Sequence, residues 1–502
     1  MEQPAERQFR QSTPAEAAQQ GRALPLRSID QLPGPKGLPL LGNALQLKPD
    51  RVHLQFEAWA REFGPFYQLR FGPRRIMVVA DHEAIAALLR DRPDGFSRSD
   101  RLREIGQEMG LPGGVFSASG EVWRRQRRMV MAAFDPGHVK RYFPALKQVA
   151  QRLAGRWLVA ARGQSPIDLQ ADLMRYTVDT IAGLAFGASV NTLESDGDII
   201  QQHLDKIFPA LFKRMFSPFP VWRYLPSRAD RQLAASVTQV LAAVDAFVAK
   251  ARQRIADQPG LRQQPSNLLE AMITAADQPD SGIDDTQVSG NVLTMLLAGE
   301  DTTANTLAWM VHLLWQHPDA LAKAVAEVRA VCPRDMDGLT LEHLAQLDYL
   351  EACAHETMRL KPVAPFLGFQ ALRPTQVADI MVPAGTMIFS VMRHDAVSEA
   401  HFPHAATFSP ERWQGDNSPG LNATSAKRIS MPFGGGPRIC PGRYLALLEM
   451  KMAMATLLGQ FDIVGLDTPD GAAPRENMAM SMSPVGLRMR VALRSGSSDG
   501  TR

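Results

Sequence analysis

The segment RISMPFGGGPRICPGRYLALLEMKMAMATLL, from Arg428 to Leu458, constrains the fold more than any other part of this 502-residue chain. It places one cysteine, Cys440, among four glycines and three prolines, and then continues directly into a helical pattern. Glycines allow backbone conformations with positive φ, and they let a large flat ligand approach the main chain because side chains are absent. The segment therefore predicts an irregular loop that leads a cysteine into a helix.

The sulfur of Cys440 is a candidate metal ligand. A buried helix is expected from Gly442 onward, because apolar residues recur there at helical spacing: Leu445, Leu448, Met452 and Ala455. The partial positive charge of a helix N-terminus favours thiolate over thiol, and a thiolate binds iron well. Arg438 is placed to reach an anionic group on a ligand held by that sulfur. The Phe433 side chain is expected to shield this site. A buried cysteine in a glycine-rich turn explains the same residues without a ligand.

A second segment, VSGNVLTMLLAGEDTTANTLAWMVHLLWQHP from Val288 to Pro318, predicts one helix of about eight turns that crosses the core. The polar sequence GEDTT interrupts its apolar run too early for a membrane helix. The Thr302 side chain can bond back to the Ala298 carbonyl, which can loosen the helix and open a small pocket. Asp301 beside it can relay protons. A solvated kink explains the same polar residues.

Two further helical patterns carry charged residues on one face. Glu356 and Arg359 are three apart in EACAHETMRLKP, where arginine can bind a carboxylate through two N–H groups. Arg412 follows about fifty residues later in FSPERW. Trp123 and Arg127 are four apart in GEVWRRQRRM and so share a helix face. A surface ion pair and a basic surface helix are the ordinary explanations of these patterns.

Composition and charge limit the class of protein. A hydrophobic content of 45% and a charged content of 21% are typical of a soluble globular protein. A net charge of +3 is too small to suggest nucleic-acid binding. Three scattered cysteines are too few for a disulfide framework or a structural zinc site, which favours a reducing cytoplasm. The first thirty residues contain no apolar run long enough for a signal peptide or a transmembrane anchor.

The order of patterns predicts a mainly α protein with small β-sheets. Residues 1–32 are expected to be a flexible polar tail, residues 33–494 a single domain, and residues 495–502 a second flexible tail. FYQLRF and RIMVVA flank GPR and predict a hairpin. The chain from Asp81 to His317 is mainly helical in pattern, with an irregular gap from about Pro93 to Ser119. Further strands are expected after Pro362 in GFQALR, QVADIMV and TMIFSVMR.

The sequence FGGGPRICPG resembles, position by position, the haem-binding signature of the cytochrome P450 family. The residues in the family's places are Phe433, Gly436, Arg438, Cys440 and Gly442. Ala298 to Thr302 match the Ala/Gly-Gly-x-Asp/Glu-Thr pattern of the family's long helix. The Glu-x-x-Arg, Pro-Glu-Arg and Trp-x-x-x-Arg patterns are also similar to the family's. The resemblance runs from about Pro33 to Arg494, with the motifs in the family's order.

The resemblance implies a cytochrome P450 fold, with a long central helix over a haem and a proximal cysteine loop. It implies that Cys440 is the axial thiolate ligand of haem b, in a loop that includes Phe433 and Gly442. It further implies that Trp123, Arg127 and Arg438 hold the haem propionates. Some relatives carry another propionate-binding arginine after Pro362, where this chain has VAPFLGF. Binding of the haem propionates is therefore expected to depend on Trp123, Arg127 and Arg438.

The same resemblance implies two further groups of residues. Asp301 and Thr302 would deliver protons to dioxygen. Three charged residues would form a buried structural network near the cysteine loop: Glu356, Arg359 and Arg412. The substrate pocket would include Phe116, Ala298, Phe366 and Met482.

The function expected is that of a soluble, bacterial-type haem-thiolate monooxygenase in the cytoplasm. It would use O2 to hydroxylate or epoxidise a lipophilic small molecule such as a fatty acid, terpenoid or steroid. Because the chain ends soon after the expected final strands, two electrons would come from a separate donor, a ferredoxin or flavodoxin with its reductase. A peroxide-driven hydroxylase, a haem isomerase and a non-enzymatic haem sensor are the alternatives, and the Asp301-Thr302 pair argues against them.

Overall fold

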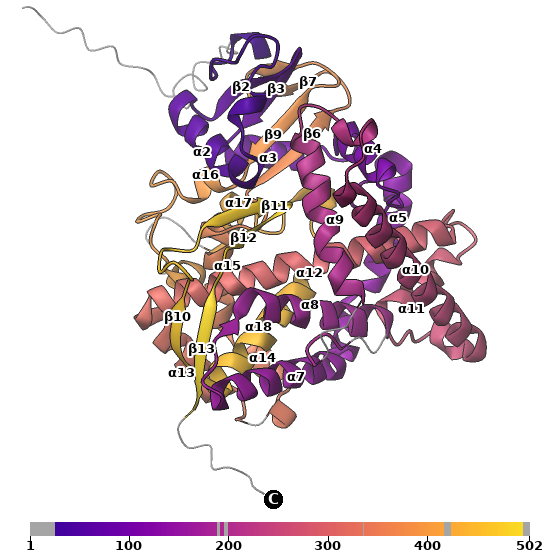
Figure 1. Cartoon of the computed structure of the whole chain (residues 1–502), viewed down its shortest axis with the longest axis vertical. Helices are drawn as coiled ribbons and strands as arrows, with labels where there is room; N and C mark the ends of the chain where they lie inside the picture. Colours follow the sequence, from indigo (N-terminus) through magenta and orange to yellow (C-terminus); the bar gives the residue numbers. More distant parts are fainter. Residues whose placement is uncertain (1–25, 188–190, 195–198, 335, 416–422, 495–502) are drawn as a thin grey trace, which may run out of the picture.

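The computed structural model describes residues 26–187, 191–194, 199–334, 336–415 and 423–494, and most of them are helical (Figure 1). The helices are α2 (Val52–Phe63), α3 (His82–Arg90), α4 (Asp100–Glu108), α5 (Gly120–Ala133), α6 (Pro136–Arg141), α7 (Phe143–Arg162), α8 (Leu169–Phe186), α9 (Ile199–Phe216), α10 (Arg228–Asp257), α11 (Leu268–Ala276), α12 (Asp285–Gln316), α13 (Pro318–Val331), α14 (Leu341–Ala345), α15 (Asp348–Leu360), α16 (Arg393–Ala396), α17 (Ala423–Ser430) and α18 (Arg443–Gln460). The mainly α prediction is therefore confirmed.

The strands form small sheets, as the sequence predicts. The largest has the order β2 (Phe66–Phe71), β3 (Arg74–Val79), β9 (Met387–Val391), β6 (Phe366–Ala371) and β4 (Phe96–Ser97). Three smaller sheets are β1 (Arg27–Ser28) with β8 (Ile380–Val382) and β7 (Thr375–Val377), β10 (Phe461–Asp467) with β13 (Arg488–Leu493) and β5 (Ile167–Asp168), and β11 (Glu476–Ala479) with β12 (Ser481–Pro484). The expected hairpin is the antiparallel pair β2–β3, in which Phe66 lies opposite Val79.

Two local structures differ from the sequence expectations. Residues 27–32 belong to the folded domain, because β1 pairs in parallel with β8 and the Ile29 and Leu32 side chains are buried. The remainder of the expected tails, residues 1–25 and 495–502, lies outside the described residues. The expected irregular gap from about Pro93 to Ser119, between α3 and α5, contains β4 and α4, and the first turn of α4 is capped by the Ser99 hydroxyl accepting from the Leu102 N–H.

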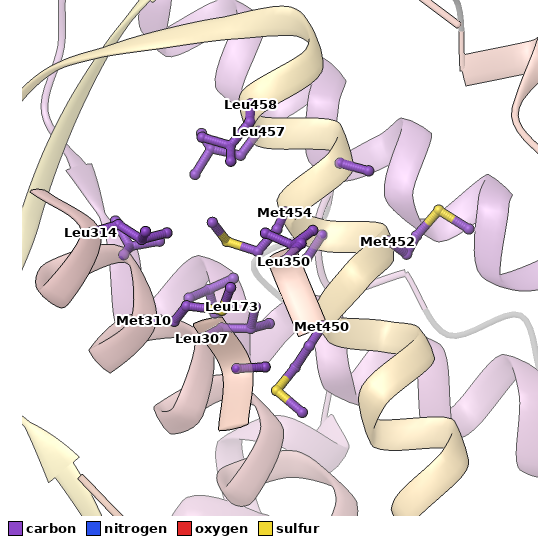
Figure 2. Close-up of a cluster of buried hydrophobic side chains, with 14 of the residues drawn as sticks. Leu173, Leu307, Met310, Leu314, Leu350, Met450, Met452, Met454, Leu457 and Leu458 are labelled. Carbon is purple, nitrogen blue, oxygen red and sulfur yellow. The ribbon is translucent and has the colours of Figure 1, made fainter. Parts of the chain in front are cut away.

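The long predicted helix is α12, which runs through the middle of the molecule (Figure 1). It begins at Asp285, where the Asp284 carboxylate accepts from the Gln287 N–H, and it ends at Gln316. Buried side chains of α12 pack with those of α18, α8 and α15 (Figure 2). The side chains in this cluster include Leu173, Leu307, Met310, Leu314, Leu350, Met450, Met454 and Leu457. The helix after the cysteine loop and the helix with the acid and alcohol therefore share one core.

Among the described residues, α10 has the length and apolar composition of a helix that could cross a membrane. In its most apolar stretch, 33% of the residues are buried. The helix α10 contacts α9 and α12. Its buried hydrophobic residues recur at helical spacing and are Leu233, Val237, Val240, Val244, Val248, Ala251 and Ile255. This amphipathic packing accounts for the hydropathy of the helix.

Candidate functional site

The cysteine loop is closed by its own backbone and seated on α3. The Cys440 N–H donates to the Phe433 carbonyl at 3.0 Å. Gly434 and Gly436 have φ angles of 72° and 65°, a region that side chains strongly disfavour. A Cβ atom on Gly436 would lie 2.2 Å from the Leu89 carbonyl oxygen. The loop therefore approaches the end of α3 so closely that only glycine fits at this position.

The electrostatics at Cys440 combine opposing effects. Burial raises the pKa of the Cys440 thiol, whereas the Gly442 N–H and the cationic Arg127 and Arg443 act to lower this pKa. Gly442 is the N-cap of α18, so the helix does begin directly after the cysteine. The Gly442 N–H acts in the expected direction, but the expected preference for thiolate is outweighed, because burial is the largest contribution to the pKa. A bound metal cation removes the proton of a coordinating thiol outright.

The expected propionate-binding residues lie together beside this loop. The Arg438 guanidinium stacks over the Trp123 ring, 4.7 Å from its centroid, and donates to the Ala118 carbonyl at 2.5 Å. Arg127 donates to the Ile439 carbonyl at 2.6 Å. Trp123 is buried on α5, which also carries Arg127. One helix face and the cysteine loop thus converge on a single cationic region.

Two further arginines, missed by the sequence motifs, extend this region. The Nε atoms of Arg92, Arg98 and Arg438 are buried, and among the described residues they have no hydrogen-bond partner. Burial lowers the pKa of Arg92 to about 8, with repulsion from Arg98 and Arg438 adding to the shift. Burial also lowers the pKa of Arg98 and of Arg438 to about 10 each. Buried cations are costly unless an anion compensates them, so this region fits a ligand with carboxylates at its edge.

These arginines were not recognised because Arg98 lies in the segment that the sequence predicts to be irregular, and Arg92 lies immediately before that segment, outside the motifs. Arg92 precedes Pro93, and Arg98 lies between β4 and α4. The Arg98 guanidinium packs 4.3 Å from the centroid of the Phe116 ring. The cationic region therefore includes buried arginines beyond Arg127 and Arg438, whereas the sequence expected haem binding to rest on Trp123, Arg127 and Arg438.

On α12 the acid and the alcohol lie at a cavity wall. The Thr302 hydroxyl donates to the Ala298 carbonyl at 2.8 Å, which confirms the predicted back-bond. The helix stays continuous at this point and is not opened by the bond. Asp301, Thr302 and Ala298 all line a cavity of about 1800 Å³. A carboxyl group and a hydroxyl group therefore line a space large enough for a cofactor and a substrate.

The cavity is lined mainly by apolar side chains near α12. Phe116, Ala298 and Phe366 line it, together with Phe208, Phe212 and Met480. Met482 does not line the cavity, which corrects the fourth expected pocket residue. Its side chain is fully buried, with the sulfur 3.9 Å from an Arg393 nitrogen, whereas the preceding Met480 and Ser481 line the cavity.

A buried polar contact joins the cysteine helix to α12. Glu449 of α18 is fully buried, and its carboxyl group hydrogen-bonds the Thr303 side chain. Burial raises the pKa of Glu449 to about 8, against the opposing effect of that hydrogen bond. Thr303 directly follows the expected catalytic Thr302 in the chain. Glu449 lies in an apolar helical stripe of the sequence, and no motif indicated this contact.

The Glu356-Arg359 pair lies in the interior, not at the surface. Both side chains are 0% exposed, and the arginine binds the carboxylate through two N–H groups at 2.7 and 2.8 Å. Arg359 also donates to the Ala396 and Ala405 carbonyls. Arg412 reaches Glu356 at 3.3 Å with an 11% exposed side chain. The three residues form one buried network, with Glu356 as the shared acceptor.

Comparison with known proteins gives one consistent family. The family model described as Cytochrome P450 matches residues 32–488. The chain is similar to a self-sufficient cytochrome P450 monooxygenase of Penicillium camemberti, with 29% identity over 94% of this chain and 44% of that protein. It is also 26% identical to the chloroplastic protein LUTEIN DEFICIENT 5 of Arabidopsis thaliana, over 80% of this chain and 67% of that protein.

A solved structure supports the same comparison. The crystal structure of the cytochrome P450DA heme domain matches with a TM-score of 0.79 and 25% identity, covering 94% of this chain and 99% of that one. The chain spans less than half the length of the fungal self-sufficient relatives that it matches.

Proposed function

The chain belongs to the cytochrome P450 family and is a haem-thiolate monooxygenase, and on this premise we propose its cofactor, substrate class and electron source. The cofactor is haem b, the substrate is a lipophilic small molecule, and the electrons come from a separate protein. The observation that carries the proposal is the Asp301-Thr302 pair on the wall of a cavity of about 1800 Å³, whose lining also includes Arg98 and Ala118, the residue whose carbonyl accepts from Arg438 of the cysteine loop.

The residues of the cysteine loop are suited to hold the haem. Cys440 would supply the axial sulfur ligand. Arg438 and Arg127 would pair with the propionates, and Arg98 adds a buried cation that still lacks a partner at its Nε atom. Trp123 fixes the orientation of Arg438 by stacking under its guanidinium.

When bound, the haem supplies reductive activation of dioxygen and insertion of one oxygen atom into the substrate. The chain's own part is to hold and move protons at the cavity wall. The Asp301 carboxyl would bring a proton to the cavity wall, and the Thr302 hydroxyl would accept a proton there as its own O–H turns from the Ala298 carbonyl and releases its proton into the cavity. The helix stays continuous there, so both groups keep fixed positions.

The cavity supports a lipophilic substrate. Its volume of about 1800 Å³ exceeds the roughly 300–1,000 Å³ of an ordinary small-molecule pocket, as a space for both haem and substrate requires. Aromatic and methionine side chains from separate elements, including Phe116, Phe366 and Met480, would exclude water and adapt to an irregular apolar shape. A fatty acid, a terpenoid or a steroid fits this description.

The proposed electron source is a ferredoxin, or failing that a flavodoxin, with its reductase. The exposed face of α5 carries Arg124, Arg125 and Arg128, on the same helix as the propionate-binding Arg127. Such a face suits an acidic partner. Some relatives are named self-sufficient, so the source of electrons is the part of the proposal that most needs a test. A cytoplasmic location is proposed too, since Cys332, Cys353 and Cys440 are all free thiols.

Reconstitution tests the proposal. The haem-loaded protein is mixed with a ferredoxin, its reductase and NAD(P)H, and with compounds that shift its visible spectrum in a screen of fatty acids, terpenoids and steroids. We expect substrate-dependent consumption of NAD(P)H and O2 in equal amounts. Turnover with peroxide but not with any electron donor would favour the peroxide-driven alternative. A spectrum that responds to ligands without any turnover would favour the sensor.

A further inference from the structure

A cluster of two histidines and one aspartate lies outside the residues of the haem pocket. His82 is the first residue of α3, Asp395 lies in α16, and His401 lies in the segment after α16. The Nδ1 atom of His82 is 2.8 Å from Oδ2 of Asp395, and Nε2 of His401 is 3.7 Å from the same oxygen. The two rings meet edge to face, with centroids 4.8 Å apart. Three parts of the chain thus bring three potential metal ligands together.

The spacing of these ligand atoms is close to that of a tetrahedral metal site. All three atoms lie within 4.8 Å of one another. Metal–ligand bonds of about 2.0–2.1 Å in tetrahedral geometry place neighbouring ligand atoms about 3.3–3.4 Å apart. The two separations that include Asp395, 2.8 and 3.7 Å, fall on either side of that value, and the two histidine nitrogens lie no more than 4.8 Å apart. Small side-chain rotations are therefore enough to admit a cation.

Burial and ligand chemistry select the kind of cation. His82 and Asp395 are each 8% exposed, whereas the His401 side chain is 30% exposed and leaves a route for a metal and a water ligand. Two imidazoles and one carboxylate suit zinc, whereas Mg²⁺ and Ca²⁺ prefer oxygen ligands throughout. No cysteine takes part, so a search of the sequence for cysteine spacing does not find this cluster.

We propose that His82, Asp395 and His401 form a zinc-binding site that clamps the start of α3 to the segment following β9. Asp395 already joins these parts, because its Oδ2 atom also accepts from the His82 backbone N–H at 2.8 Å. The opposite end of α3 supports the cysteine loop, where Gly436 packs against Leu89 and Arg90. Zinc would therefore anchor, from the far end, the helix on which the cysteine loop rests.

Equilibrium dialysis of the haem-loaded protein tests the site. The protein is treated with EDTA, dialysed against micromolar zinc, and analysed for zinc and iron by mass spectrometry, with iron as the internal count of loaded chains. We expect one tightly held zinc per chain. His401→Asn should lower the affinity by at least about tenfold, because losing even an outer partner of a metal ligand costs about 10- to 100-fold. His404→Asn is the matched control, because His404 is exposed and lies outside the cluster.

Thermal unfolding gives an independent measurement. A zinc concentration of 100 times Kd should raise the unfolding midpoint by about 2–3 °C in the wild type and in His404→Asn, but not in His401→Asn. A second variant, His401→Gln, guards against a folding defect peculiar to asparagine, and haem content confirms that each variant is folded. Equal zinc binding by wild type and both His401 variants, or no zinc retained by the wild type, would overturn the proposal. Displacement of zinc by millimolar Mg²⁺ would also contradict it.

Discussion

Replacing Arg359 by alanine should destabilise this protein more than any change to a surface ion pair. Arg359 is 0% exposed and makes five hydrogen bonds. Two go to Glu356, and three go to backbone carbonyls between α16 and the Pro410–Trp413 turn. The guanidinium also lies 4.9 Å from the centroid of the Phe402 ring. The substitution leaves a buried carboxylate short of its main cation and three carbonyls without their donor.

The magnitude follows from what each group retains. Breaking a buried ion pair by removing one partner costs about 3–5 kcal/mol. Glu356 keeps its contacts with Ser409, Arg412 and Trp413, which limits the loss at the carboxylate. The orphaned carbonyls add to the cost, so we expect a loss of at least about 4 kcal/mol from a total of roughly 5–15 kcal/mol. Arg412→Ala should cost only about 1–2 kcal/mol, because Arg412 makes a single 3.3 Å bond to Glu356.

Denaturant titration followed by circular dichroism measures these losses, and haem content per chain measures the consequence for the cofactor. Lys323→Ala is the control, since the Lys323–Glu411 pair is 58% and 47% exposed and is screened by solvent, so it should contribute little to stability. We expect the order Arg359→Ala, Arg412→Ala, Lys323→Ala in decreasing effect, with haem loading lost only in the first. An Arg359→Ala protein within about 1 kcal/mol of wild type and with normal haem content would refute the reasoning.

Three other changes test separate parts of the site. The folded-state pKa of Glu449 is about 8, above its ordinary value of 4.5, so the folded protein keeps a proton that the unfolded chain has lost between these pH values. Stability should fall as pH rises from about 4.5 to 8, and Glu449→Gln should flatten this dependence of the unfolding midpoint. Thr302→Val keeps the side-chain shape but removes the hydroxyl, so the rate of product formation should fall by roughly 100-fold or more. The control is Thr306→Val, because Thr306 is a buried threonine whose hydroxyl also bonds back along the helix. This control should leave the rate of product formation unchanged. Arg98→Gln should increase the rate at which haem is released to an acceptor protein by about tenfold, because a hydrogen bond to a charged group contributes about 1.5–3 kcal/mol. An unchanged release rate would mean that Arg98 does not contact the cofactor.

The sequence predicted the parts of the site that are local in the chain. The cysteine loop, the back-bond from Thr302 and the Glu356-Arg359 pair each depend on residues within a few positions of one another. Glycine conformations, helical spacing and side-chain reach are therefore enough to predict them. Sequence spacing alone did not show whether the Glu356-Arg359 pair is exposed or buried. That depends on Ala396 and Ala405, about forty residues further along the chain.

The parts that were missed depend on tertiary packing. Arg98 reaches the cationic region only because β4 pairs with β6, nearly three hundred residues away, and fixes the segment before α4. Residues 27–32 join the domain through pairing with β8, which short-range patterns do not report. Met482 belongs to β12, in which successive side chains point to opposite faces, so Ser481 lines the cavity whereas Met482 does not.

The two sides of the haem site are joined through one buried contact, and this explains why α12 and α18 have to share a core. Cys440 precedes α18, and Thr302 lies on α12, so any shift between these helices changes the distance between sulfur and hydroxyl. The Glu449-Thr303 hydrogen bond and the surrounding cluster of leucines and methionines resist such a shift (Figure 2). A protonated Glu449 places no charge in that core, whereas an ionised one would carry a desolvation cost. The raised pKa of Glu449 therefore keeps an uncharged contact between the helix that follows the cysteine loop and the helix that carries Asp301 and Thr302.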